Sequence, residues 1–144
     1  MLAGARDDAI EDVDVVVRPA LEATAEDVLA ADGYLLGTPA NFGYMSGALK
    51  HFFDSTFLHV GGALSSTGAA DESSGTTAGR PFGLYVHGRY DTNGAVRSVM
   101  SIVSALGWRQ AAETLEVMGD VDDSDQAAAY ELGGTLAALL MADS

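Results

Sequence analysis

Apolar residues along this chain fall into short β-branched or continuous runs that alternate with longer segments of helical spacing. Such continuous apolar runs are typical of strands that are covered on both faces of a sheet. The predicted strands lie at 12–18, 33–38, 81–87 and 110–118. The last of them is interrupted by Glu113 and Glu116, and Pro39 ends the second.

Between the strands the pattern predicts helices. Met45, Leu49 and Phe52 fall on one face of the segment after the second strand. The sequence Thr24–Asp27 resembles a capping box in which Asp replaces the usual Glu or Gln. The predicted helices lie at 1–10, 24–31, 46–57, 92–106 and 123–141. Alternating strands and helices predict right-handed crossovers, so we expect a three-layer α/β fold with an open parallel sheet.

The chain reads as a single domain over residues 1–144, with one segment that has no period. Residues 61–80 are rich in Gly, Ser, Thr and Ala and have little to bury. A loop of this length is uncommon inside a compact domain. We therefore expect 61–80 to be a flexible Gly/Ser-rich loop, which is either functional or simply mobile.

Composition narrows the class of protein and its partners. The 21 acidic and 7 basic residues give a net charge of −14, which argues against binding to nucleic acid or to an anionic membrane. This acidity indicates either a surface that docks basic redox partners or an acidic composition throughout the source organism. The chain has no cysteine, no apolar run long enough to span a membrane and no secretory signal at its start. We expect a cytoplasmic protein.

The most informative stretch is Gly33–Asp54, a buried strand followed by a loop with two aromatic residues and then a helix. Its central part, Gly37–Gly47, resembles the flavodoxin-like superfamily and is most similar to the branch of NADPH-dependent FMN reductases and NAD(P)H:quinone oxidoreductases. A second segment, Gly83–Gly94, is similar to the next strand and loop of that family. The resemblance covers nearly the whole chain except the Gly/Ser-rich loop.

The resemblance implies an FMN cofactor, with NAD(P)H as a possible co-substrate, and it assigns the ring contacts to two loops. The cofactor-binding residues that it implies are Thr38, Pro39, Ala40, Asn41, Phe42, Gly43, Tyr44, Met45, His87, Gly88, Arg89 and Asp91. Phe42 and Tyr44 are expected to stack on the flavin, unless one of them packs at the start of the helix. Thr38, Asn41, Gly43 and Met45 are expected to contribute mainly through their backbones.

Three residues of the second loop carry candidate chemistry. His87 is the candidate catalytic residue, as a proton donor to a reduced quinone, and its alternative is a hydrogen-bonded structural group. Arg89 balances charge on a reduced flavin or meets a nucleotide phosphate, or it is simply a surface cation. For Asp91, as for the neighbouring Thr92 and Asn93, we favour capping of the following helix over catalysis. No metal site is expected, since His51, Asp54 and His59 lack a fourth ligand.

The resemblance also implies a first strand and a loop that holds the FMN phosphate at a helix N-terminus. Residues 1–144 supply neither of them. We therefore expect residues 1–144 to be N-terminally incomplete, with Met1 inside the first helix. Because the absent strand lies inside the sheet, the alternatives are that residues 12–18 shift to pair with 33–38 or that another chain supplies a strand.

The leading functional hypothesis is an FMN-dependent oxidoreductase that passes electrons from NAD(P)H to a quinone or a flavin. One alternative is a flavodoxin-type electron carrier, and another is a truncated family member that does not bind FMN. The partners expected are a small-molecule electron acceptor or a redox protein. The family also implies a homo-oligomer.

Overall fold

The computed structural model describes residues 1–64, 70–71 and 75–144. A helix is present at each of the five predicted places, although the first is only four residues long. The loop predicted at 61–80 lies in part outside the described residues. The elements, in chain order, are α1 (Leu2–Ala5), α2 (Ala25–Ala30), β1 (Tyr34–Pro39), α3 (Gly47–Thr56), β2 (Ala63–Leu64), β3 (Ala70–Asp71), β4 (Pro81–Gly88), α4 (Asn93–Ala105), β5 (Arg109–Gln110), β6 (Leu115–Met118) and α5 (Asp123–Ala142).

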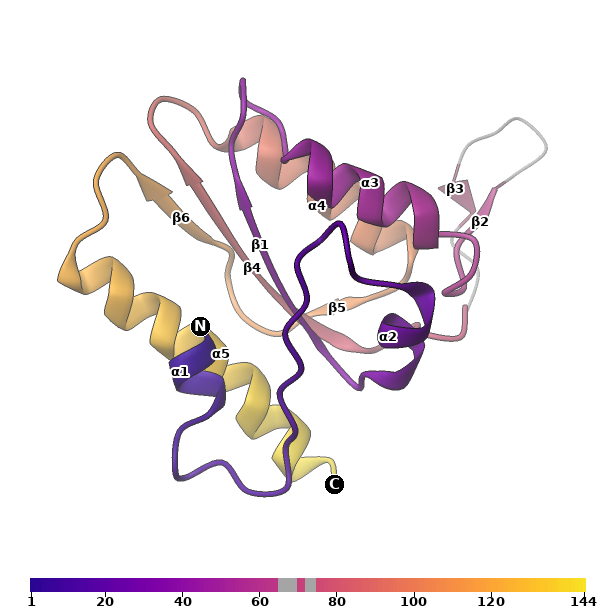
Figure 1. Ribbon diagram of the computed structural model, residues 1–144, viewed down its shortest axis with the longest axis horizontal. Coiled ribbons are helices and arrows are strands. Elements are labelled where there is room, and N and C mark those ends of the chain that lie inside the picture. Colours follow the sequence, from indigo (N-terminus) through magenta and orange to yellow (C-terminus); the bar gives the residue numbers. More distant parts are fainter. Residues whose placement is uncertain (65–69, 72–74) are drawn as a thin grey trace.

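Strand β4 is the middle of a parallel sheet. It pairs with β1 along one edge, and its other edge carries β5 near its start and β6 near its end. Helices cover both faces of the sheet. In Figure 1 the strands run between α3 and α4 on one side and α5 with α1 on the other. The predicted three-layer α/β fold is confirmed. Strands β2 and β3 form a separate antiparallel pair.

The strand predicted at 110–118 is divided in two. Between Phe82 and Tyr85 strand β4 advances by three residues, while its partner advances by five, from Gln110 to Leu115. The partner therefore has surplus residues that leave the ladder, and the Gln110 side chain donates a hydrogen bond of 3.1 Å to the Thr114 hydroxyl across them. Both parts still pair with the same edge of β4, so the topology is unaffected.

The prediction of a strand at 12–18 is wrong, because this segment forms no ladder of hydrogen bonds with any described strand. Its backbone is a loop in which Val16 and Val17 are 61% and 46% exposed. The valines favour an extended backbone, but a strand also needs a neighbouring strand to pair with. Nor does the segment pair with β1, whose ladder partner among the described residues is β4. The alternative in which 12–18 pairs with 33–38 is therefore wrong as well.

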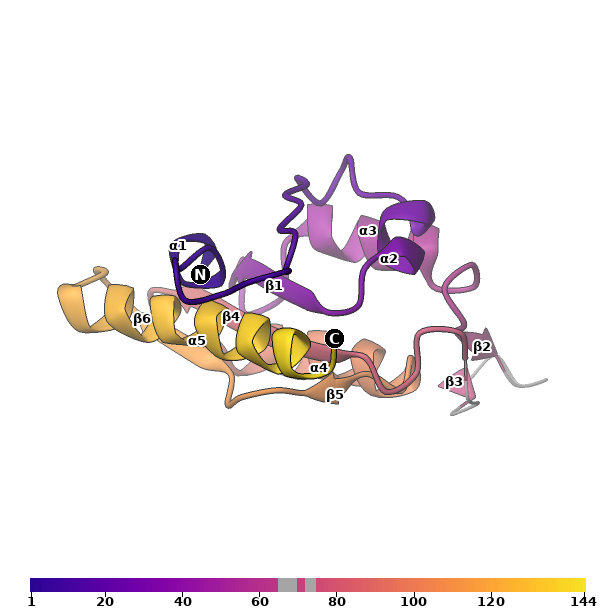
Figure 2. The same cartoon turned by 90° about the horizontal axis from the view of Figure 1, so that it is seen from below.

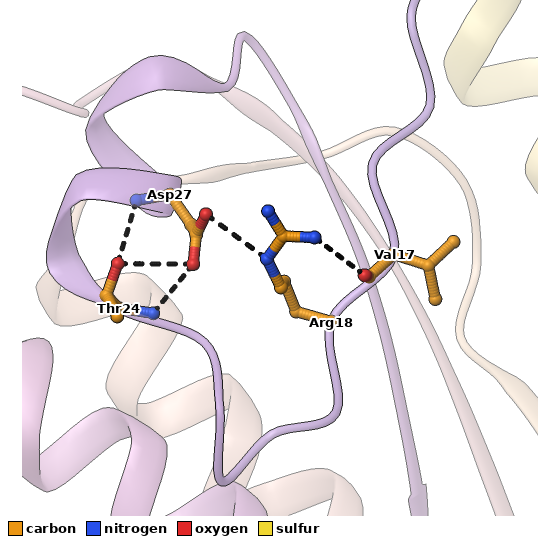
Figure 3. A network of polar contacts seen from close by, with 4 residues as sticks. All are labelled: Val17, Arg18, Thr24 and Asp27. Carbon is orange, nitrogen blue, oxygen red and sulfur yellow. Dashed lines mark hydrogen bonds and ion pairs between the residues drawn. The ribbon is translucent and has the colours of Figure 1, made fainter.

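Side-chain hydrogen bonds hold this loop instead of a ladder. The Arg6 guanidinium donates to the carbonyl of Val15 at 3.0 Å. Arg18 forms an ion pair of 3.4 Å with Asp27, which is also part of the cap of α2 (Figure 3). The predicted capping box is present, since the Thr24 hydroxyl accepts the Asp27 N–H and the Asp27 carboxylate accepts the Thr24 N–H. That last bond is the main cause of the lowered pKa of Asp27.

The main core lies between the sheet and helices α2, α3 and α4. Alternate residues of β4, namely Phe82, Leu84 and Val86, are at most 1% exposed and point into this core. The opposite face of the sheet packs on α5, where a Cβ atom added to Gly83 would lie 3.0 Å from Leu132. Helix α1 lies beside α5 in both views (Figures 1 and 2). In the part of the chain that the structure describes, no helix is both long and apolar enough to cross a membrane.

An aromatic and polar cluster fixes the amino-terminal end of the sheet. Trp108 stacks on Tyr34 with ring centroids 4.0 Å apart, and its indole N–H donates to the Thr77 hydroxyl at 2.8 Å. Arg80 closes the end of α2, since its Nη1 lies 2.7 to 3.0 Å from the carbonyl oxygens of residues 28, 29 and 31 and from the Tyr34 hydroxyl. A guanidinium in this position satisfies carbonyls that the helix itself leaves without partners.

Replacing Arg80 by Met should lower the free energy of unfolding by about 2 kcal/mol, because several carbonyls lose a charged donor at once. Arg97→Met is the matched control, since Arg97 is exposed on α4 and its side chain forms no hydrogen bond or ion pair with the residues that the structure describes. Urea denaturation of both variants measures the difference. Equal losses in the two variants would contradict the capping role.

Burial raises the pKa of Tyr34, and the Arg80 guanidinium partly opposes this. Folded Tyr34 therefore keeps its proton at a pH where unfolded tyrosine, with an ordinary pKa of about 10, has lost it. The contribution of this group to stability is complete below that pH and is lost as pH rises above it. Stability measured against pH should fall less steeply above about pH 10 in Tyr34→Phe than in the original chain. An unchanged slope would refute this.

Candidate functional site

Three loops meet where the parallel strands end. Pro39 at the end of β1 lies beside His87 of β4, and Gly88 at the end of β4 lies beside Met118 of β6. The loops that follow, at 40–46, 89–92 and 119–122, therefore belong to one edge of the sheet. In open α/β sheets ligands bind outside this carboxyl edge.

The first loop is a tight turn that presents an aromatic ring to solvent. Asn41 and Tyr44 exchange two backbone hydrogen bonds of 2.8 and 2.9 Å. Between them Phe42 and Gly43 both have positive φ, of 50° and 74°. Phe42 is fully exposed, and a non-glycine residue in this conformation is uncommon. A strained backbone that displays an unpacked aromatic side chain is typical of a ligand-binding loop.

The base of this loop is rigid. Thr38 is 1% exposed; its hydroxyl accepts the Ser46 N–H at 2.9 Å and donates to the Pro39 carbonyl at 2.8 Å. Met45 is 2% exposed and belongs to the main core. Tyr44, in contrast, is 45% exposed. Met45 therefore does the inward packing at the start of α3, and both Phe42 and Tyr44 have faces open to a ligand.

The second and third loops are joined through His87. Its Nε2 lies 2.5 Å from the carbonyl oxygen of Gly119, and the Gly119 N–H donates to the Gly88 carbonyl at 2.7 Å. Since a carbonyl only accepts, Nε2 donates its proton to this contact. This contact supports the structural alternative for His87, whose catalytic role stays a prediction.

Charged groups of the second loop also have partners. Arg89 pairs with Asp120 at 3.3 Å, and both side chains are largely exposed. The Asp91 carboxylate accepts the Asn93 N–H at 2.9 Å, which supports the capping interpretation. The buried Thr92 hydroxyl makes a 2.5 Å hydrogen bond to the carboxylate of Glu116 on β6 rather than capping α4.

Sequence reasoning missed several residues that the structure places at the same edge. Tyr90 is 93% exposed, directly after Arg89, and Met118 and Val121 are about half exposed. The available signal was their position, since each comes at or just after the end of a strand. Together with Phe42 and Tyr44 they make the carboxyl edge unusually aromatic and apolar for an exposed surface.

The surroundings of these apolar side chains are acidic. The carboxylates come from the end of β6, the two later loops and the start of α5, and they are Glu116, Asp91, Asp120, Asp122, Asp123 and Asp125. Hydrogen bonds from Ser124 and from the Asp125 N–H lower the pKa of Asp122, the N-cap of α5. Among the described residues of the three loops Arg89 is the one cation, and it faces Asp120. This edge therefore suits a neutral aromatic group better than an anion.

An FMN molecule has two parts, and the described residues fit one of them. The exposed rings of Phe42, Tyr44 and Tyr90 fit a planar aromatic ring system. A phosphate group needs backbone N–H groups at a helix start or free cations. Within the described ranges, the loops of this edge offer one cation, Arg89, and it is paired with Asp120. The starts of α3, α4 and α5 each have an N–H group already bonded to a side chain, and α1 is a single turn packed on α5.

A metal centre receives no support from the described residues, among which no group of three or more His, Asp or Glu side chains is arranged to hold an ion. The candidates His51, Asp54 and His59 are not brought together into such a group. Asp54 instead pairs with Lys50 on the same face of α3, at 2.6 and 2.9 Å.

The fold and its carboxyl edge define a flavodoxin-like α/β protein. The family model of the NADPH-dependent FMN reductases matches residues 6–119, and the chain belongs to this family.

Individual relatives agree with this assignment. A flavodoxin of Aquifex aeolicus (strain VF5) is 41% identical over 61 residues, which are 42% of this chain and 32% of that protein; the match spans about a third of the relative. Among solved structures, a flavodoxin from the domain Archaea has a TM-score of 0.69 at 13% identity, over 90% of this chain and 79% of that one. An NADPH-quinone reductase from P. pentosaceus has a TM-score of 0.51 at 17% identity, over 74% and 69%. The two structural likenesses concern the fold alone.

Replacing His87 by Ala should loosen the third loop, because Gly119 loses the side chain that holds its carbonyl. We expect faster amide hydrogen exchange at residues 119–121 and a loss of stability of about 1 kcal/mol. His87→Gln, which keeps an N–H donor, should restore part of the protection. If exchange at these amides stays unchanged in His87→Ala, the bond to Gly119 does not hold the loop.

Proposed function

We propose that this protein is an FMN-dependent oxidoreductase that passes electrons from NAD(P)H to a quinone or a flavin. The observation that carries the proposal is the fully exposed Phe42, held on a turn of positive φ at the carboxyl edge of a chain from the FMN reductase family. FMN, when bound, supplies hydride acceptance and electron transfer, and the protein supplies orientation and electrostatics.

The residues of the three loops divide this work in the proposal. Phe42 and Tyr44 stack against the ring system, and Tyr90 offers a further aromatic surface on the second loop. The backbones of Thr38, Pro39, Ala40, Asn41, Gly43 and Met45 line one side, and those of Gly88, Arg89 and Asp91 line the other. The Nε2 atom of His87 is held by the Gly119 carbonyl, so Nδ1 is the ring nitrogen left for a ligand.

A second candidate function is an electron carrier that uses the same cofactor. The acidic residues around the site favour it, because carboxylates such as Asp91, Asp120 and Asp122 suit the docking of a basic redox protein. The enzyme needs NAD(P)H and a small acceptor as partners, whereas the carrier needs a protein partner. A cytoplasmic location and a homo-oligomeric state belong to both versions of the proposal.

The test is titration of the purified chain with FMN, followed by quenching of flavin fluorescence. We expect saturable binding that Phe42→Ala weakens about tenfold, since an aromatic stack contributes about 1 kcal/mol or slightly more. Leu58→Ala is the control, because it removes an exposed apolar side chain beyond the end of α3. Equal affinities of all three proteins would refute the role of Phe42.

Turnover then separates the candidates. Oxidation of NAD(P)H by the FMN-loaded protein in the presence of a quinone supports the enzyme. Salt-sensitive electron exchange with a basic redox protein, without NAD(P)H oxidation, supports the carrier. Binding that appears only when residues encoded upstream are added would place the phosphate contacts outside residues 1–144. Absence of binding in both forms would overturn the flavoprotein proposal.

A further inference from the structure

The turn that carries Phe42 rests directly on the first turn of α4. A Cβ atom added to Gly94 would lie 1.9 Å from the carbonyl oxygen of Gly43 and 3.1 Å from its carbonyl carbon. Two non-bonded heavy atoms cannot approach so closely in a packed interior. The backbone of the 41–44 turn therefore occupies space that any other residue at position 94 would need for its side chain.

This contact matters because the Phe42 side chain is not itself held by packing. The side chain is fully exposed, so its place is set by the backbone of the turn rather than by packing. The turn closes on itself through the two bonds between Asn41 and Tyr44. The outer part of the turn lies next to the second loop without close contact, since a Cβ atom added to Gly43 would lie 3.7 Å from the Asp91 carboxylate. The seat on α4 thus fixes how far the turn stands from the rest of the carboxyl edge.

We propose that Gly94 is a positioning residue, which fixes the Phe42 ring at the height where it stacks on a planar ligand. This rests on the proposed function in that the ligand is the flavin ring. Gly94 has no side chain to touch a ligand with, and it acts through the carbonyl of Gly43. A methyl group at position 94 pushes the turn outward and moves Phe42 with it.

Gly94→Ala tests this, with FMN as the probe. We expect about tenfold weaker FMN binding, the same loss as removal of the stack itself. Amide hydrogen exchange at Tyr44, whose N–H is bonded to Asn41, should become faster even without flavin. Gly134→Ala is the matched control: it lies inside α5, and its added Cβ would make only an ordinary contact of 3.5 Å with Gly4. Unchanged affinity and exchange in Gly94→Ala would overturn the proposal.

A double-mutant cycle separates positioning from a general structural effect. If Gly94 acts through Phe42, then Gly94→Ala should cause little further loss of affinity in a Phe42→Ala background. If the two losses add in full, Gly94 acts through something other than Phe42, and the proposal fails.

Two substitutions on the other side of the contact keep the proposal testable if Gly94→Ala does not fold. Gly43→Asn should leave the turn in place, because Asn tolerates positive φ, whereas Gly43→Val should displace it. We expect near-normal FMN binding in the first and about tenfold weaker binding in the second. Equal affinities in these two variants would refute the proposal. If the original chain does not bind FMN, the proposed function fails separately, and exchange at Tyr44 still reports whether the contact with Gly94 holds the turn.

Discussion

The structure depends on β4, whose backbone needs hydrogen-bond partners on both edges and whose side chains need cover on both faces of the sheet. It is hydrogen-bonded to strands along both edges, and Leu84 and Val86 are fully buried in the main core. A strand in this position needs apolar side chains on both faces and neighbours on both sides. The same constraint produces the functional edge: because β1 and β6 run parallel to β4 and end beside it, their loops must meet.

At that edge, buried residues at the base of the loops contrast with exposed aromatic residues at their tips. Thr38, Met45 and Thr92 are buried and fix the starts of two helices, while Phe42 and Tyr90 stand almost completely in solvent. Side chains that are both apolar and uncovered cost solubility unless a ligand uses them. A rigid sheet with variable loops is how one fold serves many redox proteins, and membership of the FMN reductase family agrees with this arrangement.

Local pattern was sufficient for most elements and failed where pairing between distant segments decided the outcome. The runs at 33–38 and 81–87 form strands because each pairs with a neighbouring strand, whereas the more β-branched run at 12–18 has no partner among the described residues and is a loop. The division of 110–118 follows from register against β4, which no local pattern contains. The resemblance pointed to the Phe42 loop, but the bond between His87 and Gly119 joins residues far apart in sequence and was not predictable.

The loop at 12–18 has a consequence for association between chains. β1 has one ladder partner in the part of the chain that the structure describes, so its second edge is a template for another strand, and the exposed Val16 and Val17 lie in a valine run of high strand propensity. Such pairs of features promote aggregation through intermolecular β-pairing. Asp12, Asp14 and Arg18 flank or interrupt the run as charged gatekeepers. The net charge of −14 adds repulsion between copies, which opposes aggregation of this kind.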